Sequence, residues 1–303
     1  MTSGGDVLPG GIPPADITID TAVAKSLLRC SFPDLDGHSL EPVGSGWDNA
    51  VFRVGRDYAL RIPRHARAAV LIRHEQRWLP ELAPALPLPV PVPERVGAPT
   101  DHVPWPWSVV RWLPGQTVDR APLDGAEAPA VAAFLRALHQ PAPPDAPRNP
   151  FRGVTLVERA RAFDARLTRL PDSELGERAA VLGCWRRALA AEPASQSLWI
   201  HGDLHPGNLV SRRGRLAGVL DWGDVASGDP ATDLAAVWML FADETDRQLA
   251  FASYGADDAL RARAAGWACL FAVTLLEAGG RTPPTFRSVA RATLIRVSGN
   301  VRD

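Results

Sequence analysis

The sequence predicts an α+β fold of two lobes, with a small β-rich N-terminal lobe and a mostly helical C-terminal lobe. Short strand-like runs separated by Gly, Asp and Asn dominate the first third of the chain. Apolar residues at helical spacing dominate the remainder, apart from one short β-like region. The length of 303 residues fits about two domains, and a hydrophobic content of 46% allows a sizeable core.

The N-terminal lobe is predicted over residues 17–110, after a flexible Gly- and Pro-rich tail at 1–16. Helices are expected at 17–30 and 64–82 because apolar residues recur there with helical spacing. An antiparallel meander should lie between them, with strands at 39–43, 50–54 and 58–62. Nine prolines between Pro80 and Pro106 exclude a helix there. We favour an extended connector over a polyproline ligand for a partner protein.

The C-terminal lobe is predicted over residues 111–303, starting within an expected buried strand at 107–113 that Pro114 and Gly115 end. A small β region is expected at 197–200 and 209–220. The expected helices lie at 127–139, 155–191 with an interruption at Pro171, 231–241, 245–254, 258–276 and 286–297. Clefts between two such lobes are favoured ligand sites.

Composition argues against several classes of protein. The formal net charge is −1 and no basic stripe is present, which disfavours a nucleic-acid binder and a polybasic membrane-surface protein. The three scattered cysteines fit neither a disulfide framework nor a zinc ribbon, and they suit a reducing cytosol. We find no export signal, and the longest apolar run, 266–276, is too short to span a bilayer. We therefore expect a soluble cytoplasmic protein.

The segment W-I-H-G-D-L-H-P-G-N-L-V at 199–210 is the most informative in the chain. Asp203 and Asn208 lie five residues apart on a short loop, and Asp221 follows at the end of an expected hairpin. Asn208 and Asp221 supply hard oxygen ligands that suit Mg²⁺. Zinc held by His201 and His205 is the alternative, but an i, i+4 histidine pair suits zinc on a helix and Pro206 makes this a loop.

The pattern D-x-x-x-x-N followed by D-W-G matches the catalytic arrangement of phosphoryl transfer. In that arrangement the first Asp accepts the proton of the acceptor hydroxyl, and the Asn and the later Asp hold metal on the phosphates. The structural alternative is a capped loop whose polar residues satisfy backbone groups. The three residues together at this spacing favour catalysis.

H-G-D-L-H-P-G-N at 201–208, L-D-W-G-D at 220–224 and D-P-A-T-D-L at 229–234 resemble the aminoglycoside phosphotransferase family of antibiotic kinases, which have a protein-kinase-like fold. The resemblance covers roughly residues 39–240. It implies that Asp203 is the catalytic carboxylate and that Asn208 and Asp221 bind Mg²⁺. A protein kinase proper is disfavoured, because H-G-D and D-W-G stand in place of H-R-D and D-F-G and no A-P-E segment is found.

Phosphate binding requires backbone donors and a fixed cation. Gly44, Ser45 and Gly46 join the first two expected strands in a turn that could lay N–H groups over phosphates, although an ordinary tight turn is the default interpretation of these glycines alone. Arg61 occupies the place of the kinase lysine on the third strand; Lys25 is the only lysine in the chain, so Arg must supply any cation. Glu75 matches the helix glutamate that pairs with this cation, with Glu81 as a weaker rival.

The remaining assignments follow from the resemblance or from local pattern. Matched to the family, Arg111 supplies the carbonyl and Leu113 the amide that bind the base of ATP or GTP. His201 is expected to brace the loop, and Asp229 and Asp233 to cap a helix or stabilise the catalytic loop. Carboxylates that could bind a polycationic acceptor are Asp243, Glu244, Asp246, Asp257, Asp258 and Glu277, with Asp224 as a further candidate facing the acceptor.

These patterns predict a Mg²⁺-dependent O-phosphotransferase that moves the γ-phosphoryl of ATP or GTP to a hydroxyl of a small molecule, an aminoglycoside or another antibiotic. Two alternatives stay open. One is a metabolite kinase of the same fold, of the choline, homoserine or fructosamine type. The other is a nucleotide-binding pseudokinase without catalytic activity, which the complete set of Asp203, Asn208 and Asp221 disfavours.

Overall fold

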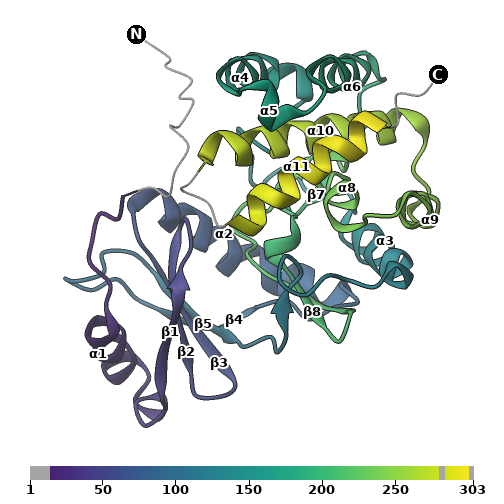
Figure 1. Cartoon of the computed structure of the whole chain (residues 1–303). Helices are drawn as coiled ribbons and strands as arrows, with labels where there is room; N and C mark the ends of the chain where they lie inside the picture. Colours follow the sequence, from purple (N-terminus) through teal and green to yellow (C-terminus); the bar gives the residue numbers. More distant parts are fainter. Residues whose placement is uncertain (1–13, 280–283, 300–303) are drawn as a thin grey trace.

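The computed structural model describes residues 14–279 and 284–299, and it has the two-lobed α+β architecture expected from the sequence (Figure 1). Most of the tail predicted at 1–16 lies outside the described residues. Asp16 is held in place, because its N–H donates to the Arg64 carbonyl and its carboxylate accepts from the Ala66 N–H, both at 2.9 Å. These two hydrogen bonds tie the segment before the first helix to the start of α2 (Ala66–Leu82).

The N-terminal lobe is a five-stranded antiparallel sheet with the strand order β1-β2-β3-β5-β4. Its apolar face packs on α1, where Leu27 contacts a cluster that includes Phe52 and Trp107. The elements are α1 (Thr21–Ser31), η1 (Pro33–Leu35), β1 (Leu40–Ser45), β2 (Asn49–Val54), β3 (Tyr58–Pro63), α2 (Ala66–Leu82), η2 (Ala83–Ala85), β4 (Pro93–Gly97) and β5 (Trp107–Arg111).

One strand of this sheet was absent from the sequence-based prediction. β4 forms inside the proline-rich stretch for which only an extended connector was expected. Proline lacks the N–H that a central strand must donate, but β4 lies at the edge of the sheet and Pro93 is its first residue, where that loss is tolerated.

The C-terminal lobe is mostly helical, as Figure 1 shows for the teal to yellow part of the chain. The expected helix over 155–191 is broken twice, at Pro171 and at Gly176, whose φ of 68° ends a helical turn. The elements are β6 (Gln116–Thr117), η3 (Gly125–Glu127), α3 (Ala128–Leu138), α4 (Leu156–Arg169), α5 (Asp172–Leu175), α6 (Arg178–Ala190), β7 (Leu198–Ile200), η4 (Pro206–Asn208), β8 (Leu209–Arg212), β9 (Arg215–Val219), β10 (Ala226–Gly228), α7 (Ala231–Leu234), α8 (Ala236–Leu240), α9 (Glu244–Tyr254), α10 (Asp258–Ala278) and α11 (Pro284–Gly299).

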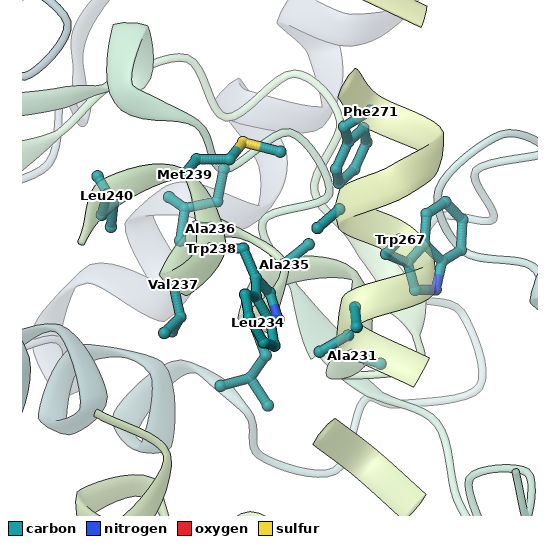
Figure 2. Packing of buried hydrophobic residues seen from close by; sticks show 14 of the residues in the cluster. Ala231, Leu234, Ala235, Ala236, Val237, Trp238, Met239, Leu240, Trp267 and Phe271 are labelled. Carbon is teal, nitrogen blue, oxygen red and sulfur yellow. The ribbon is translucent and has the colours of Figure 1, made fainter. Parts of the chain in front are cut away.

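Helix α10 forms the centre of the C-terminal lobe. By length and composition alone it is the one helix of the described chain that could cross a membrane. It packs against α4, α6, α7 and α11 instead, and Gly266 lets the helix approach Ala188 and Leu156 closely. Figure 2 shows Trp267 and Phe271 of α10 beside the buried side chains of α7 and α8. The apolar composition of α10 is thus explained by its place in the core.

The hairpin of β8 and β9 places Asn208, which precedes the first strand, beside Leu220, which follows the second. Its turn uses Arg213 and Gly214 at φ of 55° and 77°, the geometry that a two-residue hairpin requires. Beyond the last paired residues, the Leu220 N–H donates to the Asn208 carbonyl at 2.7 Å. Two segments that carry candidate site residues are therefore fixed to each other through the backbone.

Candidate active site

Asp233, in the short helix α7, holds the loop that carries Asp203. Its two carboxylate oxygens accept the backbone N–H groups of His201 at 2.7 Å and Gly202 at 2.9 Å. The side chain is fully buried, and His139 Nε2 lies 3.2 Å from the same carboxylate. A buried carboxylate bound by several donors is a rigid anchor, so this contact sets the position of the loop.

His201 is a second brace of the loop. Its Nδ1 accepts the N–H of Asp203 at 3.2 Å, so the ring donates from Nε2 to the Leu220 carbonyl at 2.9 Å. The ring is fully buried and packs edge-on against Trp222. Both ring nitrogens are thereby engaged within the protein, which removes His201 from the zinc alternative considered above.

Asp203 lies between positive and polar groups. One carboxylate oxygen is 3.1 Å from Arg152 Nη2, and the other is 3.5 Å from His205 Nε2. Burial alone would raise the pKa of Asp203, but the charges of His205 and Arg152 hold that pKa well below its usual range. The group is therefore an anionic carboxylate, ready to accept a hydrogen bond from a hydroxyl.

Asn208 and Asp221 present oxygen atoms suited to a hard cation. The Asn208 amide nitrogen donates to the Asp203 carbonyl at 2.8 Å, which leaves the amide oxygen available as a ligand. Asp221 has a left-handed backbone with φ of 57°, and its side chain is half exposed. No group of three or more His, Cys, Asp or Glu able to hold a metal occurs among the described residues. A pair of oxygen ligands with room for water and phosphate fits Mg²⁺, which seldom uses an all-protein cage.

Arg61 joins the two lobes. Its Nη1 lies 2.6 Å from Glu75 on α2, and its Nη2 lies 2.8 Å from Asp221 in the C-terminal lobe. Burial raises the pKa of Glu75 to about 7 against the opposing effect of Arg61. Glu81 instead pairs with Arg77 on the exposed face of α2, so the structure brings Glu75, and not its rival, to Arg61.

The first hairpin differs from the prediction. Gly44 and Ser45 are not turn residues, since they continue β1 opposite Val51 and Ala50 past a bulge. The Gly46 N–H closes the hairpin on the Asn49 carbonyl at 2.9 Å. These three residues do not form an open cradle of backbone donors in this conformation.

Asp48 at the tip of this hairpin lies close enough to three carboxylates of the C-terminal lobe for their charges to act on it, which sequence reasoning missed. Burial and the charges of Asp221, Asp224 and Asp203 raise the pKa of Asp48 to about 7. In the sequence Asp48 had only the signature of a turn residue, and nothing in the local pattern pointed to the opposite lobe.

The segment that follows β5, Trp112 and Leu113, leaves one backbone donor available. The Trp112 N–H donates to the Asp57 carbonyl at 2.8 Å. Among the described residues the Leu113 N–H has no protein acceptor, and the Leu113 side chain lies against Gly218 of β9. The Arg111 side chain turns away to pair with Glu94. The geometry thus permits base binding through the backbone at this point.

Two further residues, one bound to Asp203 and the other to Asp224, had no clear sequence signal. Arg152 precedes α4, 51 positions before the carboxylate that it binds. Asn149 donates to Asp224 at 2.6 Å, and Asp224 has a pKa raised to about 6 by burial and by the charge of Asp203. Both contacts depend on tertiary packing, so periodicity and motif spacing could not find them.

Three of the acidic residues considered for a polycationic acceptor have structural partners, while Asp224 lies close enough to Asp203 for their charges to interact. Asp243 and Asp257 cap α9 and α10 through the N–H groups of Thr245 and Leu260. Glu277 is bound by Arg166 and Arg169. Asp229, expected to cap or to stabilise the loop, caps the Ala231 N–H and pairs with Arg263 of α10 at 2.7 Å.

The two lobes, with a carboxylate-rich loop facing an Arg–Glu pair, define a protein-kinase-like fold. Residues 39–268 match the model of the phosphotransferase enzyme family, and the chain belongs to this family. This confirms the resemblance drawn from the motifs around Asp203 and Asp221, and it classes the chain among enzymes.

Similar known proteins are consistent with this family assignment. Viomycin phosphotransferase of Streptomyces vinaceus is 43% identical over 61 residues, 19% of this chain and 21% of the relative, so the match spans about a fifth of that protein. The GDP complex of aminoglycoside 2'-phosphotransferase-IIIa has a TM-score of 0.69 at 20% identity, covering 93% of this chain and 99% of that one. Macrolide 2'-phosphotransferase MphH from Brachybacterium faecium has a TM-score of 0.60 at 23% identity, covering 91% and 97%. These two structures share the fold.

Proposed function

We propose that the protein is a Mg²⁺-dependent O-phosphotransferase that moves the γ-phosphoryl of ATP or GTP to a hydroxyl of a small molecule. One observation carries the proposal. Asn208 bonds to Asp203, and Asp221 follows the hairpin that holds Asn208 while binding Arg61 of the opposite lobe. The residues proposed as proton acceptor, metal ligands and phosphate-binding cation are thus linked to one another, which supports phosphoryl transfer as the reaction.

The residues have distinct roles in this proposal. The acceptor hydroxyl donates its hydrogen bond to Asp203, which orients the oxygen toward the γ-phosphorus and takes the proton. The new bond joins that oxygen to phosphorus, the bond to the β–γ bridging oxygen breaks, and the nucleoside diphosphate leaves. Asn208 and Asp221 would hold Mg²⁺, which neutralises charge on the phosphates when bound. Arg61, oriented by Glu75, contacts the phosphates from the N-terminal lobe.

The base of the nucleotide would bind the connector through the Leu113 N–H and the Arg111 carbonyl. The available Leu113 donor supports this assignment. A solved relative is a GDP complex, so both ATP and GTP belong in the assay. The Gly44 to Gly46 segment would need a hairpin movement before its N–H groups could reach phosphate, because Gly46 is engaged with Asn49.

We propose an antibiotic as the acceptor and resistance as the role. The support is the family together with relatives whose names specify viomycin, aminoglycosides and macrolides. A cytoplasmic location fits the use of a nucleoside triphosphate and three cysteines that are all free thiols. A choline, homoserine or fructosamine type of metabolite kinase would use the same catalytic residues, so only the acceptor separates the two functions.

The test is a transfer assay with an open acceptor panel. The protein is incubated with MgCl₂, ATP or GTP, and a mixture of hydroxylated antibiotics and metabolites, and mass spectrometry identifies any compound that gains one phosphoryl group. An Asp203→Asn variant under the same conditions is the control. Absence of both phosphoryl transfer and Mg²⁺-dependent nucleotide hydrolysis would contradict the proposal and favour the pseudokinase alternative.

A further inference from the structure

Helices α6 and α10 pack against each other in opposite directions. Just beyond the end of α6, the Glu192 carbonyl accepts a hydrogen bond from Arg263 near the start of α10. Further along α10 and further back on α6, Gly266 lies against Ala188, so closely that a Cβ on the glycine would clash with the alanine methyl group. Two small residues at this contact let the backbones of the two helices approach each other.

One turn beyond this contact, the same pairing brings two thiols together. Cys184 lies four positions before Ala188, and Cys269 lies three positions after Gly266, so each cysteine shares a helix face with the small residue. The two cysteine side chains are hydrogen-bond partners. The third cysteine, Cys30, is exposed on α1 of the other lobe. Cys184 and Cys269 therefore form a pair that tertiary packing creates.

A cavity reaches Cys184. It has a volume of about 130 Å³ and lies between Cys184 of α6 and a wall of α10 formed by the small side chains of Ala262 and Ala265. The exposed residue Arg187 lines the same cavity, which connects it to the protein surface. A buried cysteine is ordinarily inert because reagents do not reach it. Cys184 is only 3% exposed, but the cavity gives it a path for a molecule of the size of water or a small peroxide.

The surroundings of the two thiols give them different reactivity. The hydrogen bond with Cys269 and the charge of Arg187 lower the pKa of Cys184 against the opposing effect of burial. Gly183 leaves room for this guanidinium, since a Cβ there would lie 3.6 Å from Arg187 Nη1. The hydrogen bond with Cys184 and burial raise the pKa of Cys269, which is fully buried. Because the thiolate is the nucleophile, Cys184 is the residue that reacts first.

We propose that Cys184 and Cys269 are a dithiol pair that a hydroperoxide oxidises to a disulfide. The Cys184 thiolate attacks one peroxide oxygen, the O–O bond breaks, and the products are a sulfenic acid on Cys184 and a hydroxide or alkoxide ion that takes a proton from water. The Cys269 sulfur then attacks the Cys184 sulfur, the S–O bond breaks, and water leaves with the Cys269 proton. The two thiols lose two electrons, and the hydroperoxide gains them.

The disulfide would join α6 to a helix that supports the candidate active site. Phe271 follows Cys269 by two positions on α10, and the Arg152 guanidinium lies 4.5 Å from the centroid of its ring. The same guanidinium binds Asp203 at 3.1 Å. Oxidation would therefore restrict the movement of α10 beneath this arginine. The inference does not depend on the proposed function, since it concerns the thiols and their oxidation alone.

Peroxide treatment of the folded full-length Cys30→Ser protein tests the inference. The substitution removes the exposed thiol that could join two chains. Hydrogen peroxide is added, the protein is denatured, free thiols are alkylated, and peptides are mapped by mass spectrometry. We expect a monomer that has lost two hydrogen atoms, a linked peptide pair containing Cys184 and Cys269, and recovery of both thiols with dithiothreitol. Two alkylated cysteines, or separate oxidation of each without a linked peptide, would overturn the inference.

Single cysteine variants in the same background identify the residue that reacts first. In Cys269→Ser, dimedone should label a sulfenic acid on Cys184, because the second thiol that would consume it is gone. In Cys184→Ser, Cys269 should stay unlabelled. Labelling of Cys269 instead of Cys184 would contradict the proposed order of reaction and the role of the cavity.

The path through the cavity has a matched test that leaves both sulfur atoms in place. Ala262→Leu fills the cavity from α10 and should slow disulfide formation by at least about fivefold, because access limits the rate. Ala252→Leu adds the same bulk at an exposed position of α9 and should oxidise at the wild-type rate. Equal rates in these two variants would show that peroxide does not reach Cys184 through the cavity and would overturn the inference.

Discussion

The guanidinium of Arg61 and the carboxylate of Asp221 lie 2.8 Å apart although 160 positions separate them in the chain. Arg61 is on β3 of the N-terminal lobe, and Asp221 follows β9 of the C-terminal lobe. Because Arg61 also binds the buried Glu75, one planar guanidinium connects the sheet, helix α2 and the candidate metal ligand. The contact fixes how the two lobes face each other at the site.

The shared guanidinium predicts a difference between Lys and Arg at position 61. Lysine keeps the charge but is a point donor that cannot span two carboxylates in a fork, and methionine loses the charge entirely. We expect kcat/KM for the nucleotide to fall about 10-fold in Arg61→Lys and about 100-fold or more in Arg61→Met. Steady-state kinetics at saturating Mg²⁺ measure this, with the exposed Arg56→Met as control. An unchanged Arg61→Met enzyme would remove Arg61 from the site.

Asp203→Asn should abolish the proton acceptor while keeping its shape. We expect kcat to fall by about 10²–10⁴, because that is the usual contribution of a positioned general base. The affinity for nucleotide should stay within about threefold, since Asp203 is not among the groups proposed to bind it. Single-turnover kinetics and equilibrium nucleotide binding separate the two effects. A parallel loss of nucleotide binding would show that Asp203 organises the site instead of accepting the proton.

Asp221→Ala should act through the metal. Removal of one of two protein ligands should raise the Mg²⁺ concentration needed for half-maximal activity by about tenfold or more. Asp221 also binds Arg61, so the variant Asp221→Asn is informative because it retains an oxygen ligand with less charge. Activity titrated with Mg²⁺ at fixed nucleotide measures the shift. Equal Mg²⁺ dependence in wild type and both variants would exclude Asp221 as a ligand.

The fold could be predicted from sequence because each lobe has a strong local pattern. The period-two runs around Phe52 and Leu60 give the strands, and the Arg213–Gly214 turn gives the hairpin that joins Asn208 to Asp221. β4 was missed because its prolines oppose strand formation locally, and only its place at the sheet edge makes them acceptable.

Contacts between segments far apart in the sequence were harder to predict than contacts within motifs. The pairing of Arg61 with Glu75 followed from a motif at fixed spacing, and the structure brings both residues together. Arg152 contacts Asp203, and Asp48 lies close enough to feel its charge, only because the loop before α4 and the hairpin tip come close to the Asp203 loop in the fold. No periodic or spacing signal encodes such a long-range approach. Most of the acidic residues weighed for an acceptor fall at helix starts, where acids suit the helix in any case, and Asp243 and Asp257 are indeed helix caps while Glu277 is an arginine partner.

Asp48 predicts how stability depends on pH in the metal-free protein. Its pKa rises from 3.8 in the unfolded chain to about 7 in the fold, so the folded state binds more protons between these values. The contribution of protonated Asp48 to the free energy of unfolding is therefore fully present below about pH 4. It is lost as the pH rises through about 7. Asp48→Asn should remove this loss and stabilise the protein at pH 8 by about 2–4 kcal/mol. Urea unfolding in EDTA at pH 5 and pH 8 measures it; equal wild-type and variant stability at pH 8 would contradict the expectation.

Asp233 should be more important for stability than for chemistry, because it touches no group that reacts. It accepts the buried N–H groups of His201 and Gly202. Asp233→Ala leaves both donors without a partner, which costs about 1–3 kcal/mol for each group, so a total loss of about 3 kcal/mol is expected. Asp233→Asn keeps one acceptor oxygen but turns an NH₂ group toward the second N–H, so its loss should be smaller.

Urea unfolding gives the two free energies, and the matched control is Asp258→Ala, an exposed acid at the start of α10. The activity of Asp233→Ala should fall as well, because Asp203 would no longer be held in place. The loop is tightly constrained: the Gly202 backbone has φ of 84°, and a Cβ there would lie 2.5 Å from the Asp224 carbonyl oxygen. The loop thus has little freedom to find another anchored position. If Asp233→Ala unfolded at the wild-type urea concentration and kept wild-type kcat, the buried carboxylate would not be what holds Asp203 in place.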